Sequence, residues 1–292
     1  MVPAAGFFWR VAKKTAFSGY KPVPPKPERP QTLLVFSDEN HLELLLENLW
    51  TLANSWHALP RLVVVGDLKA KEAVFRKALH WWPHEWDFMP YEQIEQTFMM
   101  ENRSWLVEFG RYHIFGRKLA AILHFARQSP TLYCDSDVLW LGEPAFLDRI
   151  DPHTPGLLVS VNPFASYCEA MIDSSSTDLM QPPFACAGLL YVSQWPWPEM
   201  ILKEWVNRAM TMPPHPLAEQ TIFGFLVRHF GGYIPNQDVA LFLVDRDRFL
   251  PINCRPAWSA RHYVTPVRYH FHRDALLMRL GIIRRKSVNK SS

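Results

Sequence analysis

The first part of the chain alternates short apolar runs with longer stretches in which apolar side chains recur every three or four positions. Residues 32–37 (Thr-Leu-Leu-Val-Phe-Ser) are rich enough in branched and aromatic side chains to form a buried strand. Residues 42–56 have the helical spacing of a segment with one face on a sheet. A second apolar run, residues 61–66, leads into a second helix that we expect to end near His80. Strand, helix, strand and helix in this order are typical of a parallel sheet with crossover helices.

The remainder of the chain contains further strands and helices, after a Trp-rich region at residues 81–86 whose pattern assigns no element. The pattern predicts helices over residues 105–127, 199–210 and 217–230, and strands over residues 131–141, 157–161 and 187–193. Near the C-terminus we expect a strand before Asp245 and an extended segment over residues 269–273. Because the chain has one linker and no internal repeat, the sequence predicts a single folded domain.

The two ends of the chain differ from the rest in charge. Of the formal net charge of +3, residues 1–30 and residues 273–292 each contribute +5, which leaves −7 on the body between them. The first segment ends in a proline-rich stretch that we interpret as a stiff linker. We therefore divide the chain into a basic and aromatic N-terminal tail with this linker (1–30), a folded domain (31–273) and a basic C-terminal tail (274–292). A nucleic-acid-binding protein more often has its basic face within the folded part, so we expect no nucleic-acid partner.

The basic tails lead to a hypothesis about membranes. If both tails lie on one side, Lys13 and Lys14 at one end and Arg279 and Arg284 at the other would contact an anionic membrane surface together. No apolar run is long enough to span a bilayer. The four cysteines have no C-x-x-C spacing and the N-terminus does not read as a secretory signal, so we expect reduced thiols and a cytoplasmic protein.

Two carboxylates, Asp135 and Asp137, interrupt the apolar run of residues 131–141. A buried strand does not accept two unpaired anions in its middle, so we expect the pair where the strand emerges at a sheet edge. Alternate residues of a strand lie about 6.6 Å apart, whereas a divalent ion holds its ligand oxygens at about 2.1 Å from the metal. A bend at Ser136, or a water in place of one carboxylate, would bring the ligands together. The pattern indicates a metal site with open positions for the phosphate oxygens of a substrate.

The same short pattern occurs again at Asp245 and Asp247, after another apolar run, so the pattern alone does not assign the site. Position separates the two pairs. The first pair follows the alternating strands and helices of a nucleotide-type half, while the second contains the bulky Arg246 and comes late in the chain. We therefore favour Asp135 and Asp137.

Two segments resemble those of a known enzyme class. Residues 132–140 (Leu-Tyr-Cys-Asp-Ser-Asp-Val-Leu-Trp) are similar to the "YLDSDVLV" segment, and residues 184–191 (Phe-Ala-Cys-Ala-Gly-Leu-Leu-Tyr) to the "FNAGLLLI" segment, of GT-A nucleotide-sugar glycosyltransferases. Within this class the segments resemble those of the family-8-like group, which is related to glycogenin and bacterial galactosyltransferases. Glu219-Gln220 stands where this group has Asp-Gln, and a histidine follows late in the chain. The resemblance spans roughly residues 32–273.

The resemblance implies an α/β fold: a GT-A-like (Rossmann-like) single domain with a mixed, mainly parallel central sheet flanked by helices. It implies an enzyme that uses Mn²⁺ or Mg²⁺ to transfer a sugar from a nucleoside-diphosphate donor, UDP-linked, to an acceptor. The sequence does not identify this acceptor, which can be a glycan, a lipid or a protein. Retention of configuration is also implied; in an inverting enzyme, Glu219 would be the base that deprotonates the acceptor.

The resemblance also assigns roles to residues. It places the metal on Asp135, Asp137 and a late histidine, for which we favour His270 over His272. The residues expected to bind the donor are Ser37, Asp38, Lys118, Ser136, Gly188 and Arg273, and those expected to act near the sugar are Glu219 and Gln220. Ordinary structural roles stay open for several of them, such as a helix cap for Asp38. Cys186 stands where the group has Asn and Glu219 where it has Asp, so the donor sugar stays open.

Two other functions compete with this interpretation. Haloacid-dehalogenase-like phosphatases also use an Asp-x-Asp after an apolar strand, but there the pair opens the domain and is followed by Gly or Thr, whereas Val138 follows here. The other alternative is a non-catalytic nucleotide-sugar-binding module of the same fold. The two aspartates and a late histidine are retained, which favours an enzyme.

Overall fold

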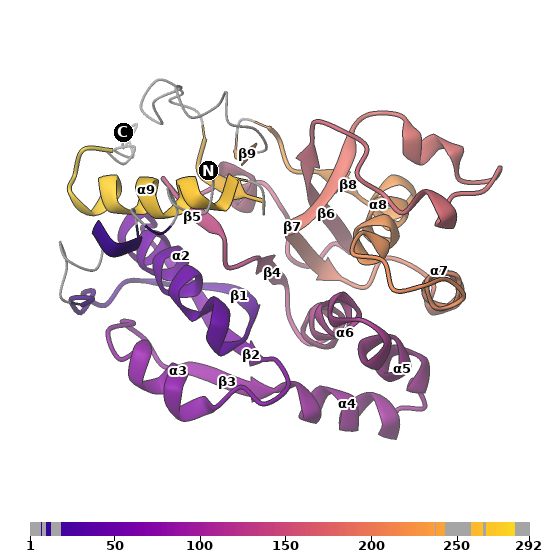
Figure 1. Cartoon of the computed structure of the whole chain (residues 1–292), viewed down its shortest axis with the longest axis horizontal. Coiled ribbons are helices and arrows are strands. Elements are labelled where there is room, and N and C mark those ends of the chain that lie inside the picture. Colours follow the sequence, from indigo (N-terminus) through magenta and orange to yellow (C-terminus); the bar gives the residue numbers. More distant parts are fainter. Residues whose placement is uncertain are drawn as a thin grey trace.

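The first half of the chain folds into the alternating strands and helices that its pattern predicts. The computed structural model describes residues 7, 10–12, 19–236, 238–242, 258–264 and 267–283 (Figure 1). The first strands and helices are β1 (Glu28–Ser37), α2 (Leu42–Ser55), β2 (Leu59–Gly66), α3 (Glu72–Ala78) and β3 (Trp86–Pro90). The three strands pair in parallel, and β3 begins at Trp86, the last residue of the Trp-rich region whose pattern assigned no element. The predicted parallel arrangement is confirmed.

Seven strands form the main sheet, in the order β3-β2-β1-β4-β7-β6-β8. The other four strands are β4 (Thr131–Cys134), β6 (Gly156–Asn162), β7 (Phe184–Gln194) and β8 (Gly232–Tyr233). Only β7 runs antiparallel to its neighbours β4 and β6, while the remaining pairs are parallel. The mixed, mainly parallel sheet predicted from the sequence is therefore present.

Helices cover both faces of this sheet. One face carries α4 (Tyr91–Met100), α5 (Ser104–Tyr112), α6 (Ile114–Ala126), α7 (Glu199–Met210) and α8 (Ala218–Phe230). The other face carries α2 and α3. Along β1 the side chains alternate between the two cores, with Leu33 and Val35 in one and Leu34 in the other. Short 3-10 turns lie at Glu39–His41, Ala145–Asp148, Glu169–Met171 and Thr177–Met180.

The predicted strand over residues 131–141 is instead two strands in different sheets. β4 ends at Cys134, the chain turns at residues 135–137, and β5 (Val138–Trp140) joins a second sheet of order β5-β10-β9. The other members of that sheet are β9 (Val239–Phe242) and β10 (Ala260–Tyr263). The two aspartates lie in the turn, where their carboxylates leave the apolar layers.

Two further predictions about secondary structure are wrong. The single helix expected over residues 105–127 is broken at His113, which is extended and whose ring accepts a hydrogen bond from the Phe115 backbone at 3.1 Å. The segment 269–273, expected to be extended, lies in helix α9 (Arg268–Arg279). The spacing of its buried residues Phe271, Ala275 and Met278 is helical, and these side chains form a third core.

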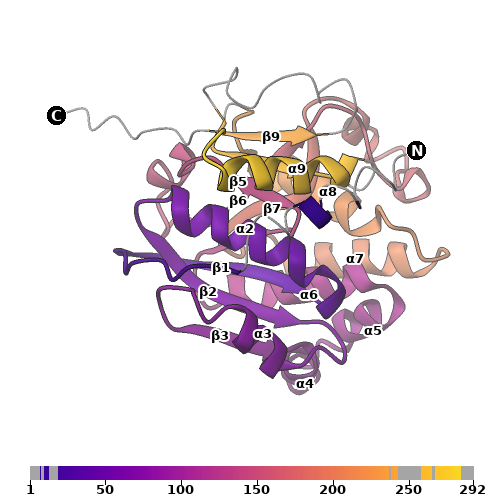
Figure 2. The same cartoon turned by 60° about the vertical axis from the view of Figure 1, so that its left-hand side comes forward.

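The folded part extends beyond both predicted boundaries of the domain. Tyr20, from the predicted N-terminal tail, stacks on Trp81 and donates its hydroxyl to Glu47 at 2.8 Å. Arg279, from the predicted C-terminal tail, is 6 % exposed in its side chain and donates to Glu47 at 2.9 and 3.0 Å. Arg279 is therefore committed to the domain and not to a membrane surface. Figure 2 shows α9 lying along α2.

Several predictions fall on residues that the structure does not describe. These are Lys13, Lys14, Arg284 and the pair Asp245 and Asp247. Within the described ranges, no helix is long and apolar enough to cross a bilayer.

Candidate functional site

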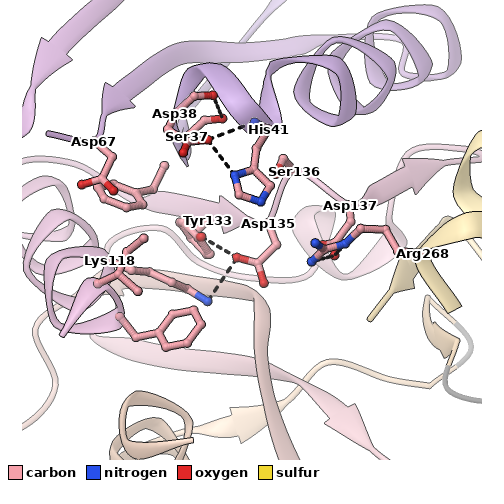
Figure 3. Close-up of a pocket in the computed structure, with 13 residues that line it drawn as sticks. Ser37, Asp38, His41, Asp67, Lys118, Tyr133, Asp135, Ser136, Asp137 and Arg268 are labelled. Atoms are coloured by element: carbon pink, nitrogen blue, oxygen red, sulfur yellow. Dashed lines mark hydrogen bonds and ion pairs between the residues drawn. The ribbon is translucent and has the colours of Figure 1, made fainter. Parts of the chain in front are cut away.

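The strands β1, β2 and β4 end at the same edge of the sheet, and a pocket of about 290 Å³ lies there (Figure 3). Ser37 ends β1, Asp67 follows β2 and Asp135 follows β4, and all three line the pocket. The chain crosses from β1 to β2 on one side, while β4 lies on the other side of β1. Such a switch point is where open α/β sheets bind ligands.

Three ligand-type side chains converge beside this pocket. One ligand atom from each of Asp135, Asp137 and His262 lies within 4.8 Å of the others. His262 Nε2 is 3.1 Å from Asp137 Oδ1 and 3.8 Å from Asp135 Oδ2. The turn after β4 removes the separation that a straight strand would impose. Two carboxylates and an imidazole are a suitable partial ligand set for a divalent ion, with the remaining positions open.

The histidine of this group is His262, not the predicted His270. Strand β10 pairs antiparallel with β5, which places His262 opposite Val138 and so next to Asp137. His270 lies on α9, is buried, and has its ring 3.9 Å from that of Tyr269. The sequence-based choice considered only the histidines of residues 269–273. Residues 260–263 (Ala-Arg-His-Tyr) do not alternate between apolar and polar side chains, and His262 lies 125 residues after Asp137, so no local pattern indicated this histidine.

Asp137 is buried and is contacted by the guanidinium group of Arg268 and by the ring of His262. Arg268 donates to Asp137 Oδ2 from Nε at 2.9 Å, and its NH2 group lies 2.7 Å from the same oxygen. Burial opposes ionisation, but His262 and then Arg268 outweigh it and lower the pKa of Asp137 to about 2. Arg268 lines the pocket. Arg273, the predicted phosphate-binding residue, does not line it and donates to Asp274 at 2.6 Å instead.

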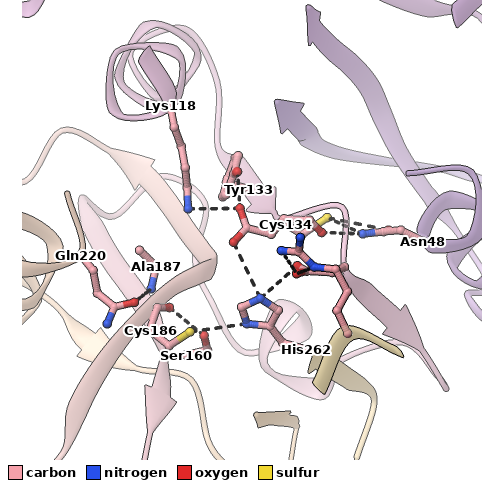
Figure 4. A network of polar contacts seen from close by, with 12 residues as sticks. Asn48, Lys118, Tyr133, Cys134, Ser160, Cys186, Ala187, Gln220 and His262 are labelled. Carbon is pink, nitrogen blue, oxygen red and sulfur yellow. Dashed lines mark hydrogen bonds and ion pairs between the residues drawn. The ribbon is translucent and has the colours of Figure 1, made fainter. Parts of the chain in front are cut away.

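The ring of His262 is confined by strand β7 (Figure 4). Cys186 Sγ lies 3.5 Å from His262 Nδ1. A Cβ atom at Gly188 would lie 2.0 Å from His262 Cε1, a distance that no pair of non-bonded carbons adopts. Gly188 is therefore required to make room for the histidine, a role different from the close approach to sugar that the resemblance implies.

The substitution Gly188→Ala is expected to displace His262 and weaken binding of a divalent ion about 10- to 100-fold, the range typical for residues that orient metal ligands. Titration with Mn²⁺, followed by the loss of its free-ion paramagnetic resonance signal, measures this. The control is Gly156→Ala, on β6, where an added Cβ meets its nearest atom at 3.5 Å. Equal Mn²⁺ affinity in wild-type protein and Gly188→Ala would contradict the close contact.

Lys118 lies on α6 with its ammonium group between two carboxylates. Its Nζ is 3.1 Å from Asp135 Oδ1 and 3.5 Å from Glu219 Oε1. The hydroxyl of Tyr133 donates to the same Asp135 oxygen at 2.5 Å. Burial opposes the charge on Lys118, but Asp135 and Glu219 outweigh it and raise its pKa. Lys118, which we expect to bind the donor, lines the pocket, whereas the adjacent Arg117 pairs with Asp67 at 2.8 Å.

Glu219 and Gln220 lie in the first turn of helix α8. Both contact the site indirectly, Glu219 through Lys118 and Gln220 through the backbone of Ala187. Glu219 is buried next to Lys118, and burial raises its pKa to about 7 although Lys118 opposes the shift. Gln220 accepts from the Ala187 backbone at 3.4 Å and donates to the Ser166 carbonyl at 2.6 Å. Gln220 therefore joins α8 to the strand that carries Cys186 and Gly188.

The raised pKa of Glu219 predicts a pH-dependent stability difference. The ordinary pKa is 4.5 and the folded-state value is about 7, so the folded protein holds this proton more tightly than the unfolded chain. The resulting stabilisation is fully present below pH 4.5 and is lost as the pH rises through 7. We expect wild-type protein to lose about 3 kcal/mol relative to Glu219→Gln between pH 4.5 and pH 8. Urea unfolding across this range tests it; parallel pH profiles would contradict it.

The predicted nucleoside-binding residues lie at the pocket. Ser37 is buried at the end of β1, and Asp38 follows it. Asp38 also caps the following turn, since its carboxylate accepts from the His41 backbone at 2.9 Å and pairs with the His41 ring at 2.6 Å. Both lining the pocket and capping the turn are therefore observed for Asp38. Ser136 lines the pocket between the two aspartates.

Comparison with solved structures identifies the fold. Mouse xyloside xylosyltransferase 1 aligns with a TM-score of 0.57 and 12% identity, over 81% of this chain and 98% of that chain. The galactosyltransferase LgtC, solved with donor and acceptor sugar analogues, gives 0.53 and 12%, over 89% and 98%. Glycosyltransferase GlyE of Streptococcus pneumoniae gives 0.53 and 13%, over 90% and 66%. No protein-family model matches the sequence, and a search of curated proteins also finds no match. At these identities the likeness shows a GT-A fold.

Proposed function

We propose that the protein is a metal-dependent glycosyltransferase that moves a sugar from a nucleoside-diphosphate donor, UDP-linked, to a glycan, lipid or protein acceptor. The convergence of Asp135, Asp137 and His262 at the switch point of a GT-A sheet carries this proposal. The likeness to solved glycosyltransferases supports the same class.

Asp135, Asp137 and His262 are the residues that would hold Mn²⁺ or Mg²⁺. The two carboxylate ligands suit either metal ion, and the imidazole ligand favours Mn²⁺. When bound, such an ion would supply positive charge for the donor diphosphate and for the negative charge that develops on the leaving nucleotide. His262 replaces His270 in this ligand set because of its position beside the aspartates.

The remaining pocket residues have chemistry that suits the donor. Arg268 is a guanidinium at the pocket wall next to Asp137, which fits it to bind diphosphate oxygens in place of Arg273. Lys118 supplies a second positive charge beside Asp135, and this one is buried. Ser37 and Asp38 are proposed to contact the nucleoside, with Ser136 beside the diphosphate. These positions orient the donor between the carboxyl ends of β1 and β4.

Glu219 and Gln220 are proposed to act near the transferred sugar. Gln220 is tied to the Ala187 backbone, and Glu219 to Lys118, so both are fixed relative to the metal ligands. Retention of configuration is proposed from the family-8 resemblance, with departure of the nucleotide as the main driving step. Cys186, which lies next to His262, stands where the resembled group has Asn. The resemblance therefore does not identify the donor sugar, and experiment has to determine it.

A screen of UDP-sugar hydrolysis with and without Mn²⁺ tests the proposal. We expect slow, Mn²⁺-dependent release of UDP from at least one UDP-sugar. Hydrolysis of p-nitrophenyl phosphate instead would favour the haloacid-dehalogenase-like alternative. Tight UDP-sugar binding without any turnover would favour the non-catalytic binding module.

A further inference from the structure

A side chain from helix α2 reaches the turn that separates the two aspartates. Asn48 is fully buried. Its Nδ2 donates to the backbone carbonyl of Asp135 at 2.8 Å (Figure 4), and its Oδ1 accepts from Trp140 Nε1 at 3.0 Å. One amide group therefore holds the chain on both sides of the turn, just after β4 and within β5.

A neighbour on the same helix completes this attachment. Thr51 lies one turn after Asn48, and its hydroxyl accepts from the Trp140 backbone at 3.0 Å while donating to the Asn48 carbonyl at 2.8 Å. The backbone of the turn also donates from Asp135 to the Gly188 carbonyl at 2.8 Å and accepts at Asp137 from Tyr263 at 2.9 Å. The turn is thus fixed from α2, β7 and β10, and Asn48 supplies the side-chain donor to the Asp135 carbonyl.

The hydrogen bond from Asn48 affects the metal site because the Asp135 carbonyl lies within two residues of both carboxylate ligands. Asp135 carries both the carbonyl that Asn48 holds and one of the carboxylates, and Asp137 is two residues further. A buried carbonyl that loses its donor is costly, so the turn would rotate toward another donor or toward water. Any such rotation changes the separation of the two carboxylates.

We infer that Asn48 is a positioning residue of the metal site: it sets the turn that brings Asp135 and Asp137 into one coordination sphere with His262. The inference rests on the proposed function, because the turn matters for catalysis only if these residues bind a metal. Residues that orient metal ligands in this way are worth about 10- to 100-fold in metal affinity.

Two substitutions distinguish the role of the Asn48 amide donor from that of its acceptor. Asn48→Leu, at similar volume, removes the hydrogen bonds to Asp135 and Trp140 and also the contact with Cys134 Sγ at 3.5 Å. Asn48→Asp retains an acceptor for Trp140 but removes the donor and sets a carboxylate against the Asp135 carbonyl. The matched control is Asn54→Ala on the same helix, since Asn54 donates to the Trp50 carbonyl within α2 at 2.8 Å.

The experiment is a Mn²⁺ titration in the presence of UDP, followed by paramagnetic resonance, with thermal unfolding of each variant. We expect both Asn48 variants to bind Mn²⁺ about 10- to 100-fold more weakly than wild-type protein, and Asn54→Ala to bind as tightly. In turnover assays, excess Mn²⁺ should restore most of kcat in the Asn48 variants. The KM for the UDP-sugar at saturating Mn²⁺ should stay within about twofold of wild type, because no donor contact is removed. A purely structural role would lower the melting temperature without moving the Mn²⁺ midpoint.

A folded Asn48 variant with the wild-type Mn²⁺ midpoint would overturn the inference. If both Asn48 variants fail to fold, Trp140→Phe removes the indole donor that orients the amide, together with part of a ring packed on Trp56. An unchanged midpoint there would overturn the inference equally. Wild-type protein that binds no Mn²⁺ would refute the proposed function and this inference together. Wild-type protein that binds Mn²⁺, with Asn48 variants that bind it equally well, would refute the inference alone.

Discussion

Replacing Asp137 by asparagine is expected to abolish Mn²⁺-dependent binding of UDP and the turnover of UDP-sugars. Asp137 is the buried ligand of the candidate metal site, and its carboxylate faces His262 at 3.1 Å and Arg268 at 2.7 Å. Asparagine keeps the shape and loses the negative charge that a divalent ion requires. Since residues that merely orient ligands are worth about 10- to 100-fold in metal affinity, loss of a ligand should cost more than about 100-fold.

Calorimetric titration of UDP in the presence of Mn²⁺ measures this loss, and near-ultraviolet circular dichroism shows whether the fold persists. The matched control is Asp247→Asn, which makes the same chemical change in the second Asp-x-Asp pattern. We expect the control to bind UDP as wild-type protein does. Undiminished UDP binding by Asp137→Asn would remove Asp137 from the ligand set.

The second large effect is expected from Lys118→Met. The ammonium group of Lys118 is buried and lies within 3.5 Å of carboxylates of both Asp135 and Glu219. Its removal leaves the buried carboxylate of Glu219 and the half-buried carboxylate of Asp135 without their shared cation. Breaking a buried pair such as Lys118 with Glu219 costs about 3–5 kcal/mol. Turnover should also fall, because Asp135 loses the partner that fixes its orientation.

A double-mutant cycle isolates the contact with Glu219. Adding Glu219→Gln to Lys118→Met removes one of the uncompensated charges, so the double variant should be more stable than Lys118→Met alone. We expect a coupling of about 0.5–3 kcal/mol from urea unfolding. The control is Arg111→Met, because Arg111 is 65% exposed in its surface pair with Glu95 and should change stability by no more than about 0.5 kcal/mol. Additive effects of Lys118→Met and Glu219→Gln would contradict the interaction.

The local pattern of apolar and polar residues was sufficient to predict where several helices and strands lie. Helix α7 begins and ends where the spacing predicts, at Glu199 and Met210, and β1 and β2 contain the predicted runs. Two charged residues within an apolar run also indicated that the strand leaves the sheet near Asp135.

Pairing between distant segments of the chain explains why the sequence did not identify His262 and Arg268 as site residues. His262 reaches Asp137 only because β10 pairs with β5 across more than 120 residues, and Arg268 enters the pocket because α9 begins directly after that strand. The prediction of His270 followed from the late histidine that the resemblance implies, with residues 269–273 expected to be extended. Phe271 and Ala275 instead pack at helical spacing, and this carries His270 into the interior.

The central claim is that Asp135, Asp137 and His262 form one metal site that serves a nucleotide-sugar donor. Pulsed paramagnetic resonance of the Mn²⁺–UDP complex tests it most directly, because a coordinated imidazole nitrogen couples to the manganese electron spin. We predict this nitrogen coupling in wild-type protein and in His270→Gln, and its loss in His262→Gln. Absence of bound Mn²⁺ in wild-type protein, or a coupling that persists in His262→Gln and disappears in His270→Gln, would contradict the account.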